Sequence, residues 1–212
     1  MFLGVKYVIE RDGKDKQGEF WTDVHHYGNV HLLENTAYLP LGFLAEETLA
    51  ELEFAGWSNA FDFQNDLFAN ATGIDRRVWY QLPGNSFTVV GKDVEISNTS
   101  SAGHCVYSDA KSGSDVTYTF SIQKDGFMCI HLDLPKRNTF YVSINGVEQY
   151  RETISLPQMI AVGDVKQGDL VDVRVQCKAG EKSTMTIVGA LLDNELFREG
   201  YEALSASVWE LS

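Results

Sequence analysis

Three histidines near the start of the sequence are the first residues whose chemistry could matter, because imidazole nitrogens bind metal ions. His25, His26 and His31 lie close together in the chain. A metal site needs ligands that converge on one point, as in tetrahedral zinc centres. His25 and His26 are adjacent, so in a strand they would face opposite ways, and no carboxylates stand at a recognisable spacing from them. We therefore expect surface histidines in a loop, with no metal and no other cofactor.

Paired carboxylates are the next candidates, because glycoside hydrolysis uses two acids held about 5 to 10 Å apart in a pocket. The sequence has 30 acidic residues, so pairs are abundant and each one is a weak signal. Asp62 and Asp66 stand at positions i and i+4 and would share the solvated side of a helix. We predict no catalytic residue among the candidate pairs, which are Asp62 with Asp66, Asp93 with Glu95, and Asp169 with Asp172.

Nucleophilic catalysis and phosphate binding have no supporting motif. The sequence contains no G-x-S-x-G, no G-x-G-x-x-G and no Walker sequence. His104 and Cys105 are neighbours whose side chains would diverge in a strand. The spacing of the three cysteines matches no zinc pattern, and we expect them to be unpaired and mostly buried.

Aromatic side chains offer another chemistry, the stacking of a flat ring on the apolar face of a sugar. The sequence contains 4 Trp and 9 Tyr. Trp79, Tyr80 and Gln81 place two rings and an amide next to an expected domain boundary, and we take them as candidate carbohydrate-binding residues. The alternative for each ring is packing in the core, which aromatic residues do by default.

The elements that must position these residues begin with a small α+β segment, residues 1–84. Its clearest element is a helix that Ser58 or Asn59 can cap and that Gly73 can end in the left-handed conformation. A shorter helix is expected just before it, at 47–57. Apolar runs predict strands at 3–9, at 28–35 and at 37–47, the last of them bent at Pro40.

Residues 85–212 change in character to β structure. Residues 115–123 alternate strictly between apolar and polar side chains, which is typical of a strand with one buried face. Asn145-Gly146 predicts a hairpin, because this pair adopts the positive φ angles of a type I′ turn, and Asp125-Gly126 marks another tight turn. Eight or more short strands separated by turns predict a mostly antiparallel β-sandwich of jelly-roll type. A C-terminal helix, which Asp193 can cap, completes this domain.

Composition and charge argue against several functions. The formal net charge of −13 is spread along the chain, whereas nucleic-acid binding and adsorption to anionic lipid need clustered Lys and Arg. No apolar run approaches the roughly 18 residues that span a bilayer. Met1 leads directly into a strand-like segment without a secretory signal. If the domain works outside the cytoplasm, we expect parts beyond this sequence to take it there.

Several phrases of the sequence resemble the YfhO family of bacterial polytopic membrane proteins. They are LGVKYVI at 3–9, NTAYLPLGF at 35–43, and SNAFDFQNDLFANATG at 58–73. In the last phrase Ala60 replaces the usual proline, while Gln64, Asn65, Leu67, Thr72 and Gly73 match the family's pattern. The β region with its VSINGVE hairpin is similar as well. The matched residues are expected to determine the fold, with Gln64 and Asn65 bonding backbone near the helix.

The resemblance implies a function larger than this chain. YfhO-type proteins resemble glycosyltransferases that decorate cell-envelope polymers such as teichoic acids, and their catalytic carboxylate is expected in a loop outside this sequence. The resemblance thus implies a soluble, non-catalytic accessory domain on the extracytoplasmic face of the membrane. Its partners would be the parent's membrane helices and a cell-wall glycan or teichoic acid polymer. The alternatives are a carbohydrate-binding β-sandwich module with its own affinity, and a hydrolase that uses unrecognised carboxylates.

Overall fold

The chain forms two compact units. Unit 1 comprises Met1–Tyr80 together with Leu192–Ser212, and unit 2 comprises Gln81–Leu191. Unit 1 is therefore assembled from two separate stretches of chain, whereas unit 2 is continuous. The computed structural model describes residues 5–11, 18–40, 43–53, 56–90, 94–97, 99, 103–108, 114–134, 138–177, 179–180 and 182–206.

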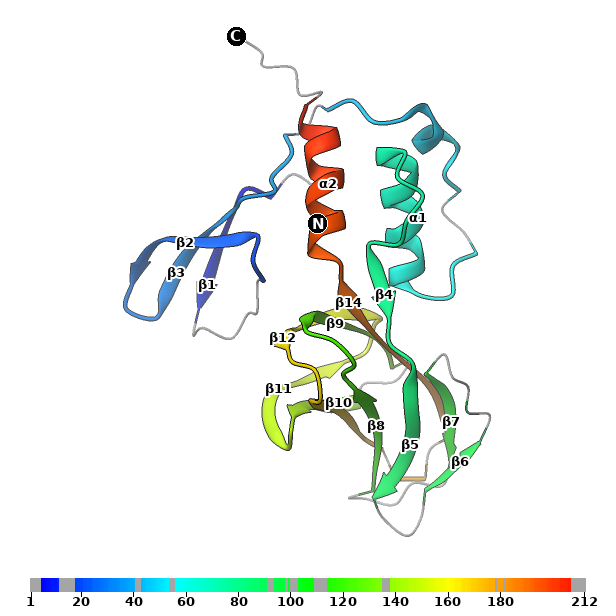
Figure 1. Cartoon of the computed structure of the whole chain (residues 1–212). Coiled ribbons are helices and arrows are strands. Elements are labelled where there is room, and N and C mark those ends of the chain that lie inside the picture. The colour runs from blue at the N-terminus through cyan, green and yellow to red at the C-terminus, as the bar shows by residue number, and fades with distance from the viewer. Residues whose placement is uncertain are drawn as a thin grey trace. The chain divides into compact units, whose positions relative to one another are not determined.

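Unit 1 combines a three-stranded antiparallel sheet with two α-helices (Figure 1). The sheet has the order β1-β3-β2, with β1 at Tyr7–Arg11, β2 at Trp21–Tyr27 and β3 at Val30–Asn35. A 3-10 helix, η1, spans Glu47–Glu51 and precedes α1 at Ala60–Thr72. Strand β4 at Trp79–Gln81 follows, and α2 at Asn194–Ser205 completes the unit.

The caps of both helices lie where the sequence predicts them. The Asn59 side-chain oxygen accepts hydrogen bonds from the backbone N–H groups of Phe61 and Asp62, at 2.8 and 3.2 Å, so Asn59 and not Ser58 is the cap. Gly73 ends α1 in the left-handed conformation, with φ at 71°. Asp193 caps α2 by accepting a bond from the Leu196 N–H at 3.0 Å. These local signals are read correctly because they depend on residues only a few positions apart.

The two helices of unit 1 contact each other where a glycine faces an aromatic ring. Phe68 of α1 is 2% exposed, and a Cβ atom added to Gly200 of α2 would collide with its ring. Helix α2 thus belongs to unit 1, whereas the predicted division placed it with the sandwich in 85–212. The apolar stripe of a helix shows that it has a partner but does not say which one.

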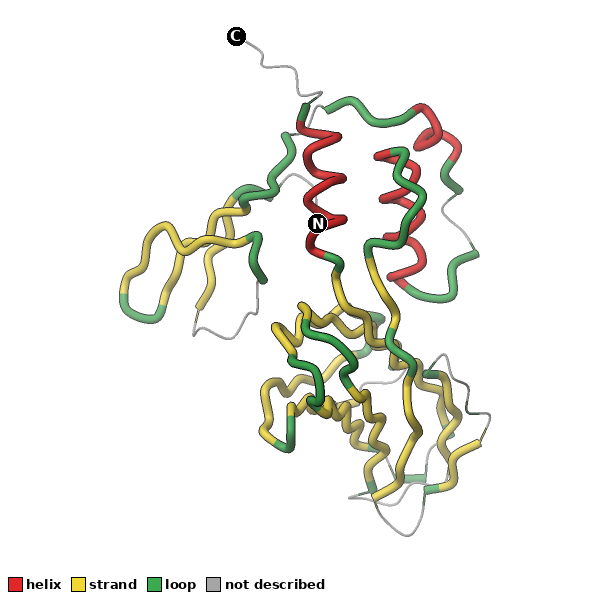
Figure 2. Tube along the Cα trace, viewed as in Figure 1, coloured by secondary structure: helices red, strands yellow, loops and turns green. Residues whose placement is uncertain are grey.

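Unit 2 is a β-sandwich whose chain passes repeatedly between two sheets (Figures 1 and 2). One sheet has the order β11-β10-β13-β8-β5, and the other has the order β12-β9-β14-β7-β6, with β4 pairing with β14. These sheets confirm the predicted fold class, an α+β fold in which a smaller segment of helices and strands accompanies a mostly antiparallel β-sandwich. The strands are β5 Gly84–Val90, β6 Glu95–Ser97, β7 His104–Ser108, β8 Asp115–Ser121, β9 Gly126–Asp133, β10 Asn138–Ile144, β11 Val147–Ile154, β12 Gln158–Val165, β13 Leu170–Gln176 and β14 Ser183–Leu192.

The core of the sandwich consists of the inward-facing residues of both sheets. The strictly alternating segment at β8 behaves as predicted, because its apolar members are at most 2% exposed: Val116, Tyr118, Phe120 and Ile122. The apolar face of β9 is fully buried as well, through Met128, Ile130 and Leu132. The three cysteines are free and buried, in agreement with the sequence.

The two turn predictions in unit 2 have different outcomes. Asn145 and Gly146 connect β10 to β11 with φ angles of 51° and 79°, which confirms the hairpin. Asp125-Gly126 forms no hairpin, because the strands on either side, β8 and β9, belong to different sheets. The Asp125 carboxylate instead accepts bonds from the Gln167 N–H at 2.8 Å and from Lys166 Nζ at 3.0 Å.

Two predictions for unit 1 are wrong. The described residues of 37–47 form no strand beyond a single bridge at Leu39. Ala37 and Leu39 are buried in irregular backbone, at 2% and 0% exposed, whereas Leu44 is 57% exposed. His25 and His26 lie in β2 and not in a loop. Periodicity alone does not distinguish a buried irregular segment from a buried strand. Of the strand predicted at 3–9, residues 3 and 4 lie outside the described residues.

Candidate functional site

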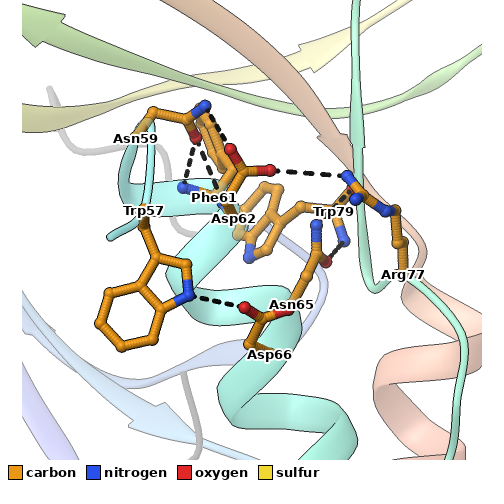
Figure 3. A network of polar contacts seen from close by, with 8 residues as sticks. All are labelled: Trp57, Asn59, Phe61, Asp62, Asn65, Asp66, Arg77 and Trp79. Atoms are coloured by element: carbon orange, nitrogen blue, oxygen red, sulfur yellow. Dashed lines mark hydrogen bonds and ion pairs between the residues drawn. The ribbon is translucent and has the colours of Figure 1, made fainter. Parts of the chain in front are cut away.

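The predicted sugar-binding residues Trp79, Tyr80 and Gln81 form β4. Asn65 of α1 holds this strand through the backbone of Trp79 (Figure 3). Asn65 Oδ1 accepts a bond from the Trp79 N–H at 2.7 Å, and Asn65 Nδ2 donates to the Trp79 carbonyl at 3.1 Å. Asn65 is 4% exposed, so both bonds are shielded from water. The side chain therefore pairs with the backbone as a neighbouring strand would, which confirms the structural role expected for Asn65.

The indole of Trp79 is packed inside unit 1. Trp79 is 8% exposed, and its ring centroid lies 5.1 Å from that of Phe61. Its Nε1 atom donates to Gln64 Oε1 at 2.8 Å, so the indole is also satisfied as a donor. Core packing, the alternative considered for each aromatic ring, is thus what the structure shows for Trp79.

The next two residues of β4 have more access to solvent. Tyr80 is 56% exposed, while Gln81 is half-buried. Side chains alternate along a strand, so Tyr80 points away from the side on which Trp79 packs. Among the three predicted residues, Tyr80 is the one whose ring a sugar could reach without rearrangement.

The candidate carboxylates of α1 make contacts that connect neighbouring segments (Figure 3). Asp66 Oδ2 accepts a bond from Trp57 Nε1 at 2.6 Å. Asp62 accepts a bond from Asn59 Nδ2 at 3.0 Å and lies 3.5 Å from Arg77 Nη1. These contacts give both acids a structural role, in connecting α1 to the segments before and after it.

His25 and His26 occupy opposite faces of β2, and His31 lies on the neighbouring strand β3. His26 pairs with His31 in the sheet and stacks on it with ring centroids 5.7 Å apart, whereas His25 pairs with Leu32. His31 Nδ1 lies 2.6 Å from Asp23 Oδ2, and this hydrogen bond holds the pKa of the Asp23 carboxyl below its usual range. Within the described part of the chain, no group of three or more His, Cys, Asp or Glu is placed to hold a metal ion.

A row of charged and aromatic side chains, which is not predicted from the sequence, crosses the five-stranded sheet of unit 2. In the sheet register Tyr141 of β10 pairs with Arg151 of β11 on one side and with Arg174 of β13 on the other. Directly paired residues point to the same face of a sheet. The neighbouring Phe140 is buried in the core, so the three paired side chains point outward. The guanidinium carbons of Arg151 and Arg174 lie 5.0 and 4.1 Å from the Tyr141 ring centroid.

Asp115 of β8 extends this row, which we call the arginine–tyrosine row: Arg151, Tyr141, Arg174 and Asp115. Asp115 Oδ2 lies 3.0 Å from Arg174 Nη1, and the side chains of Asp115 and Arg174 are 13% and 43% exposed. The other oxygen, Asp115 Oδ1, is buried and has no hydrogen-bond partner among the described residues. Arg174 is thus fixed between a ring and a carboxylate while part of its guanidinium stays accessible.

The surface around the row is rich in hydroxyl groups. Thr119 Oγ1 donates to Asp172 Oδ1 at 2.5 Å. The hydroxyls of Thr139 and Thr153 lie 2.8 Å apart. Guanidinium donors, carboxylate acceptors and hydroxyls that do both match a ligand with many hydroxyl groups.

A sequence signal for the row does exist. Tyr141 and Arg174 stand at polar positions of alternating strands, where an aromatic or a basic side chain must face solvent. Their strands are separated by β11 and β12, so the sequence gives no direct sign that the two residues are neighbours. The register between β10 and β13 brings them together.

The fold and the site define a β-sandwich with a polar outer face, joined to a second unit of one small sheet and two helices. The chain matches the model of the family described as bacterial membrane protein YfhO over residues 1–211. It therefore belongs to this family of bacterial membrane proteins, which confirms the resemblance found in the sequence. In the described ranges no helix is both long and apolar enough to cross a membrane. No curated protein matches the sequence.

Part of the chain is similar to solved carbohydrate-binding modules. One is a family 35 module from Clostridium thermocellum, at 10% identity and a TM-score of 0.35, covering 53% of this chain and 96% of that one. Another is the CBM36-1 domain of a multidomain xylanase from the hindgut metagenome of Trinervitermes trinervoides, at 13% identity and a TM-score of 0.32, covering 53% and 95%. Likeness of this extent does not indicate what this chain binds.

Proposed function

We propose that this chain is a non-catalytic, extracytoplasmic accessory domain of a YfhO-family membrane protein. In this proposal the parent acts as a cell-envelope glycosyltransferase, and unit 2 contacts the carbohydrate or teichoic acid polymer that the parent modifies. The observation that carries the contact is the arginine–tyrosine row on the outer face of the five-stranded sheet.

The row suits such a polymer because it is already ordered. Tyr141 lies between two guanidinium groups, so little side-chain freedom remains to be lost on binding. Among the described residues Arg151 makes no ion pair with an acid, and its donors can serve sugar hydroxyls or the phosphates of a teichoic acid.

A second candidate function is a carbohydrate-binding module with affinity of its own. The exposed ring of Tyr80 favours it, because this ring could stack on the apolar face of a sugar. In this view Trp79 supports the strand from within unit 1, while the Tyr80 ring on the other side of the strand meets the sugar. The two candidates differ in the affinity of the isolated chain and share the same kind of ligand.

Calorimetric titration with soluble envelope glycans and a teichoic acid tests the proposal. We expect Tyr141→Ala and Arg151→Gln each to weaken binding about tenfold, which corresponds to about 1.4 kcal/mol. Arg198→Gln is a matched control, because Arg198 also lies near a ring and an acid, 5.9 Å from Phe20 and 2.7 Å from Glu19, but on unit 1. Its affinity should equal that of the wild type.

The outcomes separate the candidates. A dissociation constant of about 1 μM for one glycan favours the independent module, whereas a dissociation constant of about 1 mM favours the accessory domain. If the row variants bind as well as the control, the row is not the contact. Turnover of a chromogenic glycoside, abolished by one Asp or Glu substitution, would overturn the non-catalytic assignment.

A further inference from the structure

One face of the three-stranded sheet in unit 1 exposes a set of apolar side chains. The register places Ile9 opposite Leu32, and Val30 opposite Tyr27, all on the same face as Tyr7. Four of these residues are well exposed: Tyr7 at 50%, Ile9 at 66%, Tyr27 at 86% and Val30 at 41%. We call this surface the tyrosine face, which comprises Tyr7, Ile9, Tyr27, Val30 and Leu32.

The opposite face of the same sheet is the packed one. Glu10 and Leu33 are each 7% exposed, and Asn35 is 6% exposed. The Asn35 side chain donates to the Val5 carbonyl at 3.1 Å and accepts from the Ala37 N–H at 2.9 Å. An antiparallel sheet with one packed face normally turns polar side chains toward water on the other. The apolar tyrosine face departs from this pattern, so it is a candidate interaction surface.

The tyrosine face also lacks the negative charge that dominates the chain. The carboxylate on this face of the described strands belongs to Glu34, which pairs with Lys6 at 3.8 Å and accepts the Tyr7 hydroxyl at 3.2 Å. Arg11 pairs with Val30 and adds a positive charge. The whole chain, by contrast, has a net charge of −13.

We propose that the tyrosine face lies against the lipid headgroup layer of the membrane that holds the parent protein. Tyrosine is amphipathic and is enriched at membrane interfaces, where its ring is apolar and its hydroxyl stays in water. Ile9 and Val30 would reach the boundary of the acyl chains, and Lys6 and Arg11 would meet the phosphates. The inference rests on the proposed function as a domain of a membrane protein.

The charge of the tyrosine face suits a lipid surface better than the net charge of the whole chain does. The acidic remainder of the domain is repelled by anionic lipid, so attachment must come from apolar contact at this face. Charges at the surface are screened beyond about 8 Å at physiological salt, which limits that repulsion. We therefore expect binding to zwitterionic vesicles and only a weak dependence on anionic lipid.

Vesicle co-sedimentation of the intact chain tests this assignment, with phosphatidylcholine vesicles and with vesicles that also contain phosphatidylglycerol. The double variant Ile9→Glu with Tyr27→Glu should lower partitioning at least about tenfold, because two charges would enter the interface. Leu156→Glu is the matched control, since Leu156 is 69% exposed but lies in unit 2. Its partitioning should equal that of the wild type.

Each outcome decides the proposal. A loss confined to the double variant supports it, provided that its circular dichroism and thermal unfolding match those of the wild type. If the double variant unfolds, the milder pair Ile9→Thr with Tyr27→Ser takes its place. The proposal is overturned if the wild type binds neither kind of vesicle, or if all variants bind the vesicles equally well. It is also overturned if the face mediates concentration-dependent self-association without vesicle binding. The glycan titrations use unit 2 variants, so the two proposals can fail separately.

Discussion

Replacing Asn65 by leucine tests whether α1 holds β4 through its backbone. The substitution removes both bonds to Trp79, at 2.7 and 3.1 Å, and leaves a buried N–H and a buried carbonyl without partners. Each such loss costs about 1 to 3 kcal/mol, so the sum is about 2 to 6 kcal/mol. Leucine has a similar volume and regains some apolar contact, and we expect a net loss of about 3 kcal/mol in the free energy of unfolding.

Urea unfolding followed by tryptophan fluorescence measures this loss. Hydrogen exchange adds a local measurement, because the Trp79 amide should lose its protection in the variant. Asn70→Leu is the matched control: it lies on the same helix, but its side chain donates to the Asp66 carbonyl at 2.9 Å in an exposed position. The control should change the free energy of unfolding by less than about 0.5 kcal/mol.

Asn65→Asp adds a pH test of the same contact. The new carboxyl keeps the acceptor for the Trp79 N–H, but only its protonated form can donate to the Trp79 carbonyl. Burial and this bond should raise its pKa in the folded protein above the unfolded value of about 3.9. The variant should therefore be stable below that pH and lose stability as the pH rises through the folded pKa. Equal costs for Asn65→Leu and Asn70→Leu, or a pH profile like that of the wild type, would refute the reasoning.

Other expectations concern helix packing, thiol reactivity and acid sensitivity. Gly200→Ala should lower the thermal stability of unit 1 although alanine favours helices by about 1 kcal/mol, because its Cβ collides with Phe68; unchanged stability would contradict this contact. Burial raises the pKa of all three cysteines to about 12, so a thiol reagent at about pH 8 should label them only after unfolding, and rapid labelling of the folded protein would contradict their burial. The hydrogen bond from the Gln167 N–H lowers the pKa of the Asp125 carboxyl in the folded protein. The stability that the ionised carboxylate contributes is therefore lost below about pH 4, as the pH falls through this folded pKa. In an acid titration, the variant Asp125→Asn should lack this loss of stability.

The sequence predicts best those features that depend on neighbouring residues. Asn59 and Asp193 cap helices because a side-chain oxygen reaches a backbone N–H two or three positions away. The Asn145-Gly146 hairpin depends on the φ angles of two residues. The alternation of apolar and polar side chains in β8 indicates directly that one face of the strand is buried. In each case the physical cause lies within a few residues, so no knowledge of distant contacts is needed.

The features that the sequence does not reveal depend on pairing between distant segments. Gly200 gives no sign that its partner is Phe68, more than a hundred positions earlier. Tyr141 and Arg174 look like ordinary polar positions until the β10–β13 register joins them. The sequence makes Trp79 a candidate ligand contact, but α1 buries it. Asn65 binds its backbone N–H, and the Phe61 ring packs against its indole. Tertiary contacts therefore decide which of several equivalent aromatic residues faces water.

The insertion of unit 2 into unit 1 has a consequence for biosynthesis. The chain leaves unit 1 along β4 and returns along β14, and bonds such as Asp193 N–H to the Val78 carbonyl, at 2.9 Å, join the two passages. A ribosome releases residues in order, so every strand of the sandwich emerges before α2 does. The Phe68 ring of α1 therefore stays uncovered until α2 has been synthesised. We expect the sandwich to fold first and thereby to bring the late helix back to its partner.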